Sequence, residues 1–209
     1  MRQQLPIGLR FVFDTILTRV KFWASCYCKI TKPILCTCRC RSFVMEDRTQ
    51  RPTTGLRIGD LSKLASKIKA MSKHNDMTAV AAAGPPGSGK SSVAEALQEI
   101  IGETCCVVPM DGFHLDNDTL AARGLLQVKG APETFDLKGF ARLVDGLKSR
   151  TVRHFPTFDR DANSVVTDGG TVPEGVSILL FEGNYLLFDE DGWTDLADRW
   201  DASLWLDVP

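Results

Sequence analysis

Apolar and polar residues follow one another in blocks along residues 56–209, and the blocks differ in period. Short apolar runs predict buried strands at residues 78–83, 105–110, 176–181 and 203–208. Apolar residues three and four positions apart predict amphipathic helices over residues 58–71, 93–101 and 136–147. Strands that alternate with helices are typical of an α/β fold with a doubly wound, mainly parallel sheet.

One further block combines apolar residues with a turn sequence. Residues 165–172 hold Asp168-Gly169-Gly170 between apolar positions. Asp-Gly between two short apolar runs favours a tight turn, so we expect a β-hairpin within this segment.

A glycine-rich loop joins the first predicted strand to the next helix and satisfies the pattern G-x-x-x-x-G-K-[ST]. Its backbone N–H groups and the helix N-terminus attract phosphate, the lysine contacts the outer phosphates, and the hydroxyl after it binds Mg²⁺. A dinucleotide-binding loop would need glycine or alanine at position 92, where serine stands. The residues predicted to bind nucleotide are Gly84, Pro85, Pro86, Gly87, Ser88, Gly89, Lys90, Ser91 and Ser92.

Two acidic residues come directly after predicted strands. Asp111 follows residues 105–110, and Glu182 follows residues 176–181. Ligands of open parallel sheets bind at the carboxyl ends of the strands. At this edge Asp111 can accept the proton of a hydroxyl that attacks the γ-phosphate. Alternatively, Asp111 has only a structural role in a turn or as a helix cap. Glu182 is predicted to hold Mg²⁺ together with Ser91, because a buried acid without a cation is costly.

Several stretches carry a resemblance to a known family. They are GPPGSGKS (84–91), MDGFHLDN (110–117), RG and KGAPETFD within 123–136, FPTFDR (155–160), EGNY (182–185) and WLDVP (205–209). From about residue 56 to 209 the chain resembles the phosphoribulokinase, uridine kinase and bacterial-type pantothenate kinase group of P-loop kinases. It is most similar to a nucleoside or nucleotide kinase-like branch whose substrate is unsettled.

The resemblance implies transfer of the γ-phosphoryl group of ATP, with Mg²⁺, to a hydroxyl of a small metabolite. It implies that Asp111 is the general base and that Lys90 stabilises the transferring phosphate. The acceptor pocket implied by the resemblance is lined by His114, Arg123, Asp159, Arg160 and Tyr185. For Arg123 and Arg160 the alternative is a solvated surface position, which is the more common one for arginine. For His114 the alternative is a hydrogen bond to the loop backbone without a role in the pocket.

The chain departs from the family after residue 209, where the family continues into a lid helix with an arginine and a last strand. We therefore expect residues 45–209 to form an incomplete kinase domain with a bare sheet edge. An arginine that stabilises the transferring phosphate can contribute about a thousandfold in rate. A catalytically impaired ATP-binding fragment is the alternative function.

Residues 1–44 differ in composition from the rest of the chain. They hold eight basic residues against Asp14 alone, a formal charge of +7, and five of the seven cysteines. Charged residues interrupt every apolar run, which argues against a transmembrane span. We interpret this segment either as a targeting extension of the mitochondrial type or as a gene-model artefact that precedes a start at Met45. The localisation predicted is cytoplasmic, or mitochondrial if the segment is a real leader.

Residues 45–209 hold 17 basic and 25 acidic residues, a formal charge of −8. An acidic body argues against binding to nucleic acid. A GTPase-like switch lacks support, because no N-K-x-D sequence follows the loop. The expected partner is a small-molecule substrate, and a homodimer stays open. Pantothenate, a nucleoside, glycerate and a sugar are all acceptors that fit the sequence.

Overall fold

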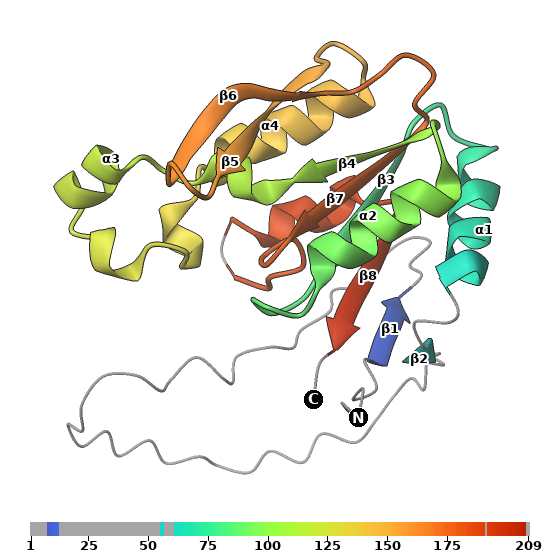
Figure 1. Cartoon of the computed structure of the whole chain (residues 1–209), viewed down its shortest axis with the longest axis horizontal. Coiled ribbons are helices and arrows are strands. Elements are labelled where there is room, and N and C mark those ends of the chain that lie inside the picture. The colour runs from blue at the N-terminus through green and yellow to red at the C-terminus, as the bar shows by residue number, and fades with distance from the viewer. Residues whose placement is uncertain (1–7, 13–54, 57–60, 191, 208–209) are drawn as a thin grey trace.

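The computed structural model describes residues 8–12, 55–56, 61–190 and 192–207, which are built around a six-stranded sheet (Figure 1). Its strand order is β2-β1-β8-β3-β7-β4, and neighbours among the last four strands are parallel. This confirms the predicted α/β fold with a mainly parallel sheet. The strands of this sheet are β1 (Gly8–Val12), β2 (Gly55–Leu56), β3 (Thr78–Ala83), β4 (Cys105–Pro109), β7 (Ile178–Gly183) and β8 (Ala202–Asp207).

Helices cover both faces of the sheet, as a doubly wound fold requires (Figure 1). On one face α1 and α2 pack against Val80 and Leu180, and on the other α4 packs against Ala81 and Phe181. The helices are α1 (Leu61–Ser72), α2 (Lys90–Ile101), α3 (Asn117–Ala122) and α4 (Leu137–Lys148), with 3₁₀ helices η2 (Met110–Phe113), η3 (Leu126–Val128), η4 (Pro132–Thr134) and η5 (Thr194–Arg199).

The central strands are apolar throughout because neither face meets water. Every residue of β3 and of β7 is buried. Five consecutive residues of β3, four alanines and Val80, have no exposed surface, so helices on both sides approach the strand closely. Sequence alternation is therefore absent in these strands, as expected for a sheet buried on two sides.

The predicted hairpin within residues 165–172 is wrong. These residues lie in one strand, β6 (Ser164–Thr171), which pairs antiparallel with β5 (His154–Asp159) in a separate two-stranded sheet. The turn lies between the two strands, where the Asp159 carboxylate accepts hydrogen bonds from two backbone N–H groups. The two glycines of β6 serve another purpose, because a Cβ at either position would collide with the Thr157 or the Phe155 side chain.

The sheet edge beside β8 is covered, which corrects the expectation of a bare edge. β1 pairs antiparallel with β8 over five residue pairs, from Gly8 with Asp207 to Val12 with Ser203. Gly8–Val12 of the predicted extension thus belongs to the sheet. Most of residues 1–44 lie outside the described residues, so the division of the chain at residue 44 stays a prediction.

Candidate active site

The loop after β3 has the backbone of a phosphate-binding turn. Gly87 and Gly89 have positive φ values of 75° and 83°, a conformation that glycine adopts without strain. A Cβ at Gly84 would lie 2.9 Å from the carbonyl oxygen of Leu206, so the loop packs closely on β8. No side chain caps the N-terminus of α2, and its first turn holds no acidic residue. The N–H groups there are suited to bind an anion.

Lys90 is the first residue of α2 and points back into the loop. Its Nζ donates to the carbonyl oxygen of Pro85 at 2.8 Å, and the residue is only 7% exposed. Burial lowers the pKa of Lys90, and the charges of Glu182 and Asp111 oppose this shift. A buried ammonium held by a single carbonyl is available for phosphate oxygens.

Ser91 and Glu182 meet across the end of the sheet. The Ser91 hydroxyl donates to Oε2 of Glu182 at 3.3 Å, although the two residues are 91 positions apart. Glu182 lies in β7 opposite Ala82 of β3 and Pro109 of β4, so it sits between the loop and η2. Burial raises the pKa of Glu182, and the nearby charge of Asp111 adds to the shift, whereas Lys90 and the Ser91 hydrogen bond lower it. A hydroxyl and a buried carboxylate are ligands that suit Mg²⁺.

Asp111 lies in η2, two residues beyond the end of β4. Its Oδ2 is 3.2 Å from the guanidinium of Arg160, which stands on the turn between β5 and β6. The Asp111 side chain is 27% exposed and that of Arg160 78%, so the pair opens to solvent. Gly112 makes this position possible, because a Cβ there would lie 2.1 Å from the carbonyl oxygen of Pro156 in β5.

His114 follows η2 and lies between two aromatic rings. Its Nδ1 is 2.8 Å from the carbonyl oxygen of Asp111, and its ring centroid is 4.1 Å from that of Phe135 and 4.9 Å from that of Phe158. The hydrogen bond to the loop carbonyl and the two ring contacts fix the imidazole. His114, Asp111 and Arg160 are thereby brought together, as the sequence predicts.

The other three predicted acceptor residues differ in their surroundings. Tyr185 is half-buried among aromatic rings, and its hydroxyl donates to the carbonyl oxygen of Gly130 at 2.7 Å. The Asp159 carboxylate is used by the turn between β5 and β6. Arg123 is exposed at the C-terminal end of α3, where no contact with Asp111 joins it to the cluster within the described residues.

Comparison with known proteins identifies relatives of this chain. A protein of Schizosaccharomyces pombe named "Putative uridine kinase" is 34% identical over 165 residues, which cover 72% of this chain and 69% of that protein. A pantothenate kinase of Leifsonia xyli is 33% identical over 138 residues. The chain belongs to the uridine kinase and pantothenate kinase group of P-loop kinases.

A solved structure agrees with the assignment of this chain to the P-loop kinases. A crystal structure from Silicibacter, described as a putative fructose transport system kinase, is 42% identical with a TM-score of 0.66 and covers 71% of this chain and 75% of that one. The alignment with the pantothenate kinase spans 62% of this chain and 42% of that enzyme. No family model matches the chain.

The sequence predicted no role for Gly112 and Lys129, although both lie in the motifs that carry the resemblance. Gly112 is required by the contact with β5, and Lys129 contacts the turn between β5 and β6. A lysine before glycine has no local signature, because most lysines are solvated surface residues. Only the packing of α3 and its following loop against β5 and β6 brings Lys129 to the site.

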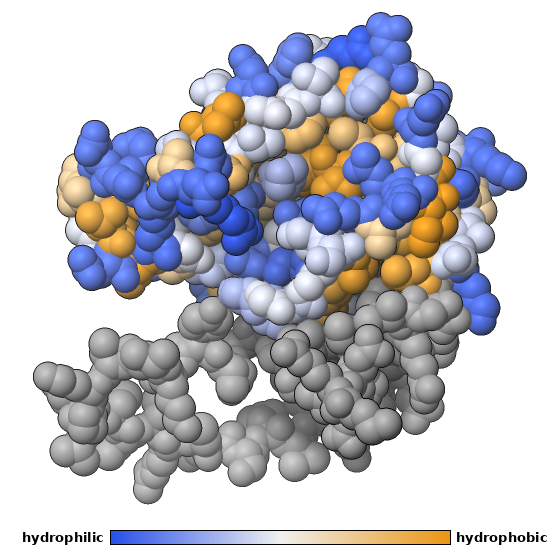
Figure 2. All heavy atoms as spheres, viewed as in Figure 1, coloured by the Kyte–Doolittle hydropathy of each residue, from blue (hydrophilic) through white to orange (hydrophobic). Residues whose placement is uncertain are grey.

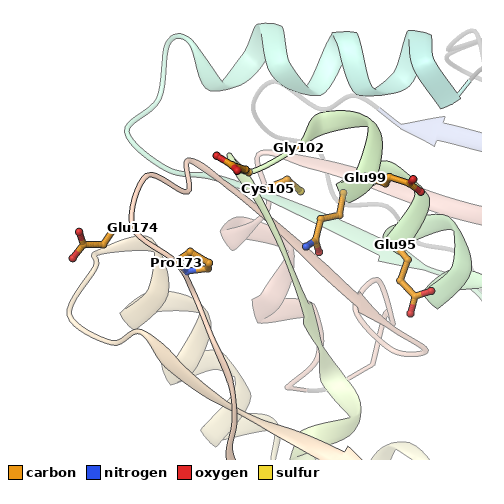
Figure 3. Close-up of a pocket in the computed structure, with 8 residues that line it drawn as sticks. Glu95, Glu99, Gly102, Cys105, Pro173 and Glu174 are labelled. Carbon is orange, nitrogen blue, oxygen red and sulfur yellow. The ribbon is translucent and has the colours of Figure 1, made fainter.

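A cavity of about 620 Å³ lies away from the P-loop, at the opposite end of α2 (Figure 3). It is lined by Glu95, Gln98, Glu99, Gly102, Glu103, Cys105, Pro173 and Glu174. Burial raises the pKa of Cys105 to about 12, so its thiol is protonated and a poor nucleophile at neutral pH. Gln98 accepts a hydrogen bond from the N–H of Val107 and is thus used by the fold.

The described residues contain neither a membrane-spanning helix nor a cluster of metal ligands. No helix there has the length and hydrophobicity that crossing a membrane requires. No group of three or more His, Cys, Asp or Glu side chains in that part of the kinase could hold a metal ion.

Proposed function

We propose that this chain binds Mg·ATP in the loop of residues 84–91 and transfers the γ-phosphoryl group to a hydroxyl of a small metabolite. The observation that carries the proposal is the group of charges at one end of the sheet. Asp111 and Arg160 lie close enough to Lys90 and Glu182 to affect the pKa of both, and Asp111 pairs with Arg160 at 3.2 Å. Lys90 begins the helix after β3, Asp111 follows β4, and Glu182 lies near the carboxyl end of β7. Ligands of parallel α/β sheets bind at this edge.

The residues divide between the nucleotide and the acceptor. Backbone N–H groups of the loop and Lys90 would bind the phosphates, and Ser91 and Glu182 would hold Mg²⁺ together with phosphate oxygens. When bound, the ion neutralises charge on the phosphates.

Asp111 would act as the general base toward the acceptor. The hydroxyl oxygen forms a bond to the γ-phosphorus, the bond from that phosphorus to the oxygen bridging it to the β-phosphate breaks, and ADP leaves. The hydroxyl proton passes to the Asp111 carboxylate. Arg160 shares that carboxylate and can turn to the incoming phosphoryl group, because its side chain is largely exposed. His114 and Tyr185 would support the acceptor pocket, with Arg123 and Asp159 at its outer edge.

Calorimetric titration of Mg·ATP into the chain tests the first half of the proposal. Lys90→Ala removes a charge that contacts phosphate oxygens, so we expect the affinity to fall about a hundredfold or more. Lys138→Ala, which changes an exposed lysine of α4, is the matched control and should bind as the unchanged chain does. Equal binding by the Lys90→Ala variant would contradict the proposal.

The second half is tested by ADP release with hydroxyl acceptors. Asp111→Asn should leave Mg·ATP binding nearly intact and lower transfer by about a hundredfold to ten-thousandfold, the contribution of a general base. Equal transfer rates for the two proteins would disprove the role of Asp111. Binding without transfer to any acceptor would favour an ATP-binding fragment over an active kinase.

A further inference from the structure

The ammonium group of Lys129 is held in place by uncharged side chains. Its Nζ donates to Oδ1 of Asn117 at 2.8 Å and to Oδ1 of Asn163 at 3.0 Å, and it lies 5.3 Å from the ring centroid of Phe158. Among the described residues no carboxylate forms an ion pair with it. Amide oxygens and an aromatic face fix the position of an ammonium without neutralising its charge.

A continuous set of contacts joins Lys129 to the proposed base. Phe158, under the ammonium, stacks at 4.9 Å on His114, and His114 is hydrogen-bonded to the backbone of Asp111. The next residue, Gly130, is held by the hydroxyl of Tyr185. Figure 1 shows α3 and the turn of the β5–β6 hairpin on the same side of the molecule. Lys129 thus forms one wall with Phe158 and His114, and the proposed function puts this wall on the side of the acceptor.

This wall holds two cations, Lys129 and Arg160, beside the acidic residues Asp159 and Asp161 of the turn. Arg160 stands on the same turn as Asn163 and pairs with Asp111, so two cations lie on the side from which the acceptor must approach. The carboxylate of Asp159 accepts hydrogen bonds from backbone N–H groups of the turn. In Figure 2 the lobe that contains α3 shows hydrophilic residues mixed with hydrophobic ones. A neutral acceptor would leave the fixed charge of Lys129 without a counterpart.

We propose that the acceptor carries a carboxylate or phosphate group besides its reacting hydroxyl, and that Lys129 binds this group. The inference rests on the proposed function, since it concerns the acceptor of that transfer. The anionic group undergoes no bond change and serves to orient the hydroxyl toward Asp111. Because the ammonium is already fixed by two asparagines, little side-chain entropy is lost when the anion binds.

Matched pairs of compounds that differ in one charge test this proposal. Each is titrated into the full chain in the presence of Mg²⁺ and a non-hydrolysable ATP analogue. The carboxylate pairs are pantothenate with pantothenol and glycerate with glycerol, and the phosphate pair is fructose 6-phosphate with fructose. We expect one anionic compound to bind at least about tenfold more tightly than its neutral match, because a hydrogen bond between charged groups contributes about that much or more.

Variants of Lys129 separate charge from structure. Lys129→Gln keeps a donor for the asparagine oxygens but removes the charge, and it should weaken binding of the preferred anion about tenfold to a hundredfold while leaving its neutral match unchanged. Lys129→Arg should restore the preference. Lys138→Gln, on exposed α4 surface, should behave as the unchanged chain does.

Three outcomes would overturn the inference while the proposed function stands: a neutral compound binds as tightly as its anionic match, the preference survives Lys129→Gln, or no compound binds to a chain that binds the analogue. Failure of the analogue itself to bind would overturn the proposed function, and this inference with it.

Discussion

Burial of charged and polar residues at the proposed nucleotide site lowers the free energy of unfolding. Lys90 and Glu182 are buried, and burial disfavours the charged form of each, so the pKa of Lys90 is lowered and that of Glu182 is raised. Their mutual attraction offsets only part of this cost. Ser88 adds to this cost, because its buried hydroxyl has no hydrogen-bond partner among the residues that the structure describes. Groups that cost stability in this way are typical of binding sites, in agreement with the proposed function.

Glu182→Gln tests this conclusion through pH. The pKa of Glu182 lies above its ordinary value of 4.5, so between these two values the folded chain binds more protons than the unfolded chain. The free energy of unfolding therefore falls as the pH rises through that window. Glutamine does not titrate, so the variant should lack this fall and be more stable than the unchanged chain at pH 7.

Urea denaturation at several pH values measures the difference. Glu95→Gln changes an exposed carboxylate on α2 and is the control, for which the pH dependence should not change. A Glu182→Gln variant that is less stable than the unchanged chain at pH 7 would show that its attraction to Lys90 outweighs the cost of burial.

The 3₁₀ helix η2 positions the proposed base by close packing against β5. Gly112 is the point of contact, since its missing side chain leaves room for the backbone of Pro156. Asp111 and His114 lie on either side of Gly112 in the sequence. Arg160 lies on the turn that follows β5, the strand that contains Pro156. Glycine is required here by proximity to another backbone and not by a special φ value.

Gly112→Ala should therefore separate η2 from β5. The new Cβ would lie 2.1 Å from a backbone oxygen, and backbone cannot move aside as the end of a flexible side chain can. We therefore expect a loss of about 1–3 kcal/mol in the free energy of unfolding. Urea denaturation measures it. The comparison variant is Gly124→Ala, whose Cβ would meet nothing within 4 Å and which pays only for a positive φ, about 1 kcal/mol. A smaller loss at Gly112 than at Gly124 would contradict the packing argument.

Across the whole molecule, the sheet is completed by a strand from the start of the chain. β1 lies antiparallel beside β8, whose carboxyl end packs against the P-loop at Gly84. An uncovered edge at β8 would present unpaired N–H and C=O groups to other chains. β1 thus protects the strand that supports the phosphate-binding loop.

Arg10→Pro tests the role of β1. Arg10 pairs with Gly55 on one side and with Trp205 on the other, and proline removes a backbone donor from this position. We expect a loss of about 1–3 kcal/mol in stability and increased aggregation, measured by urea denaturation and light scattering. Arg10→Thr keeps the donor and suits a strand, so it should behave as the unchanged chain does. Equal behaviour of the two variants would show that β1 does not contribute.

The sequence predicted most elements of the parallel sheet correctly because their signals are local. Apolar runs marked β3, β4 and β7, and Asp136 caps α4 as expected, its carboxylate accepting from the N–H of Gly139. The hairpin was mistaken because Gly169 and Gly170 imitate a turn, whereas they leave room for side chains of β5. A glycine that relieves a contact across strands looks the same in sequence as one that makes a turn.

The sequence by itself determined the glycine-rich loop, the α/β order, and the places of Asp111 just after β4 and of Glu182 near the carboxyl end of β7, since each depends on residues close together in the chain. Only the tertiary structure decided which distant charges meet. Arg160 reaches Asp111 across 49 positions, and Lys129 reaches Asn163 across 34. These contacts depend on how the β5–β6 hairpin and the segment around α3 pack beyond β4, a property that no local pattern of residues encodes.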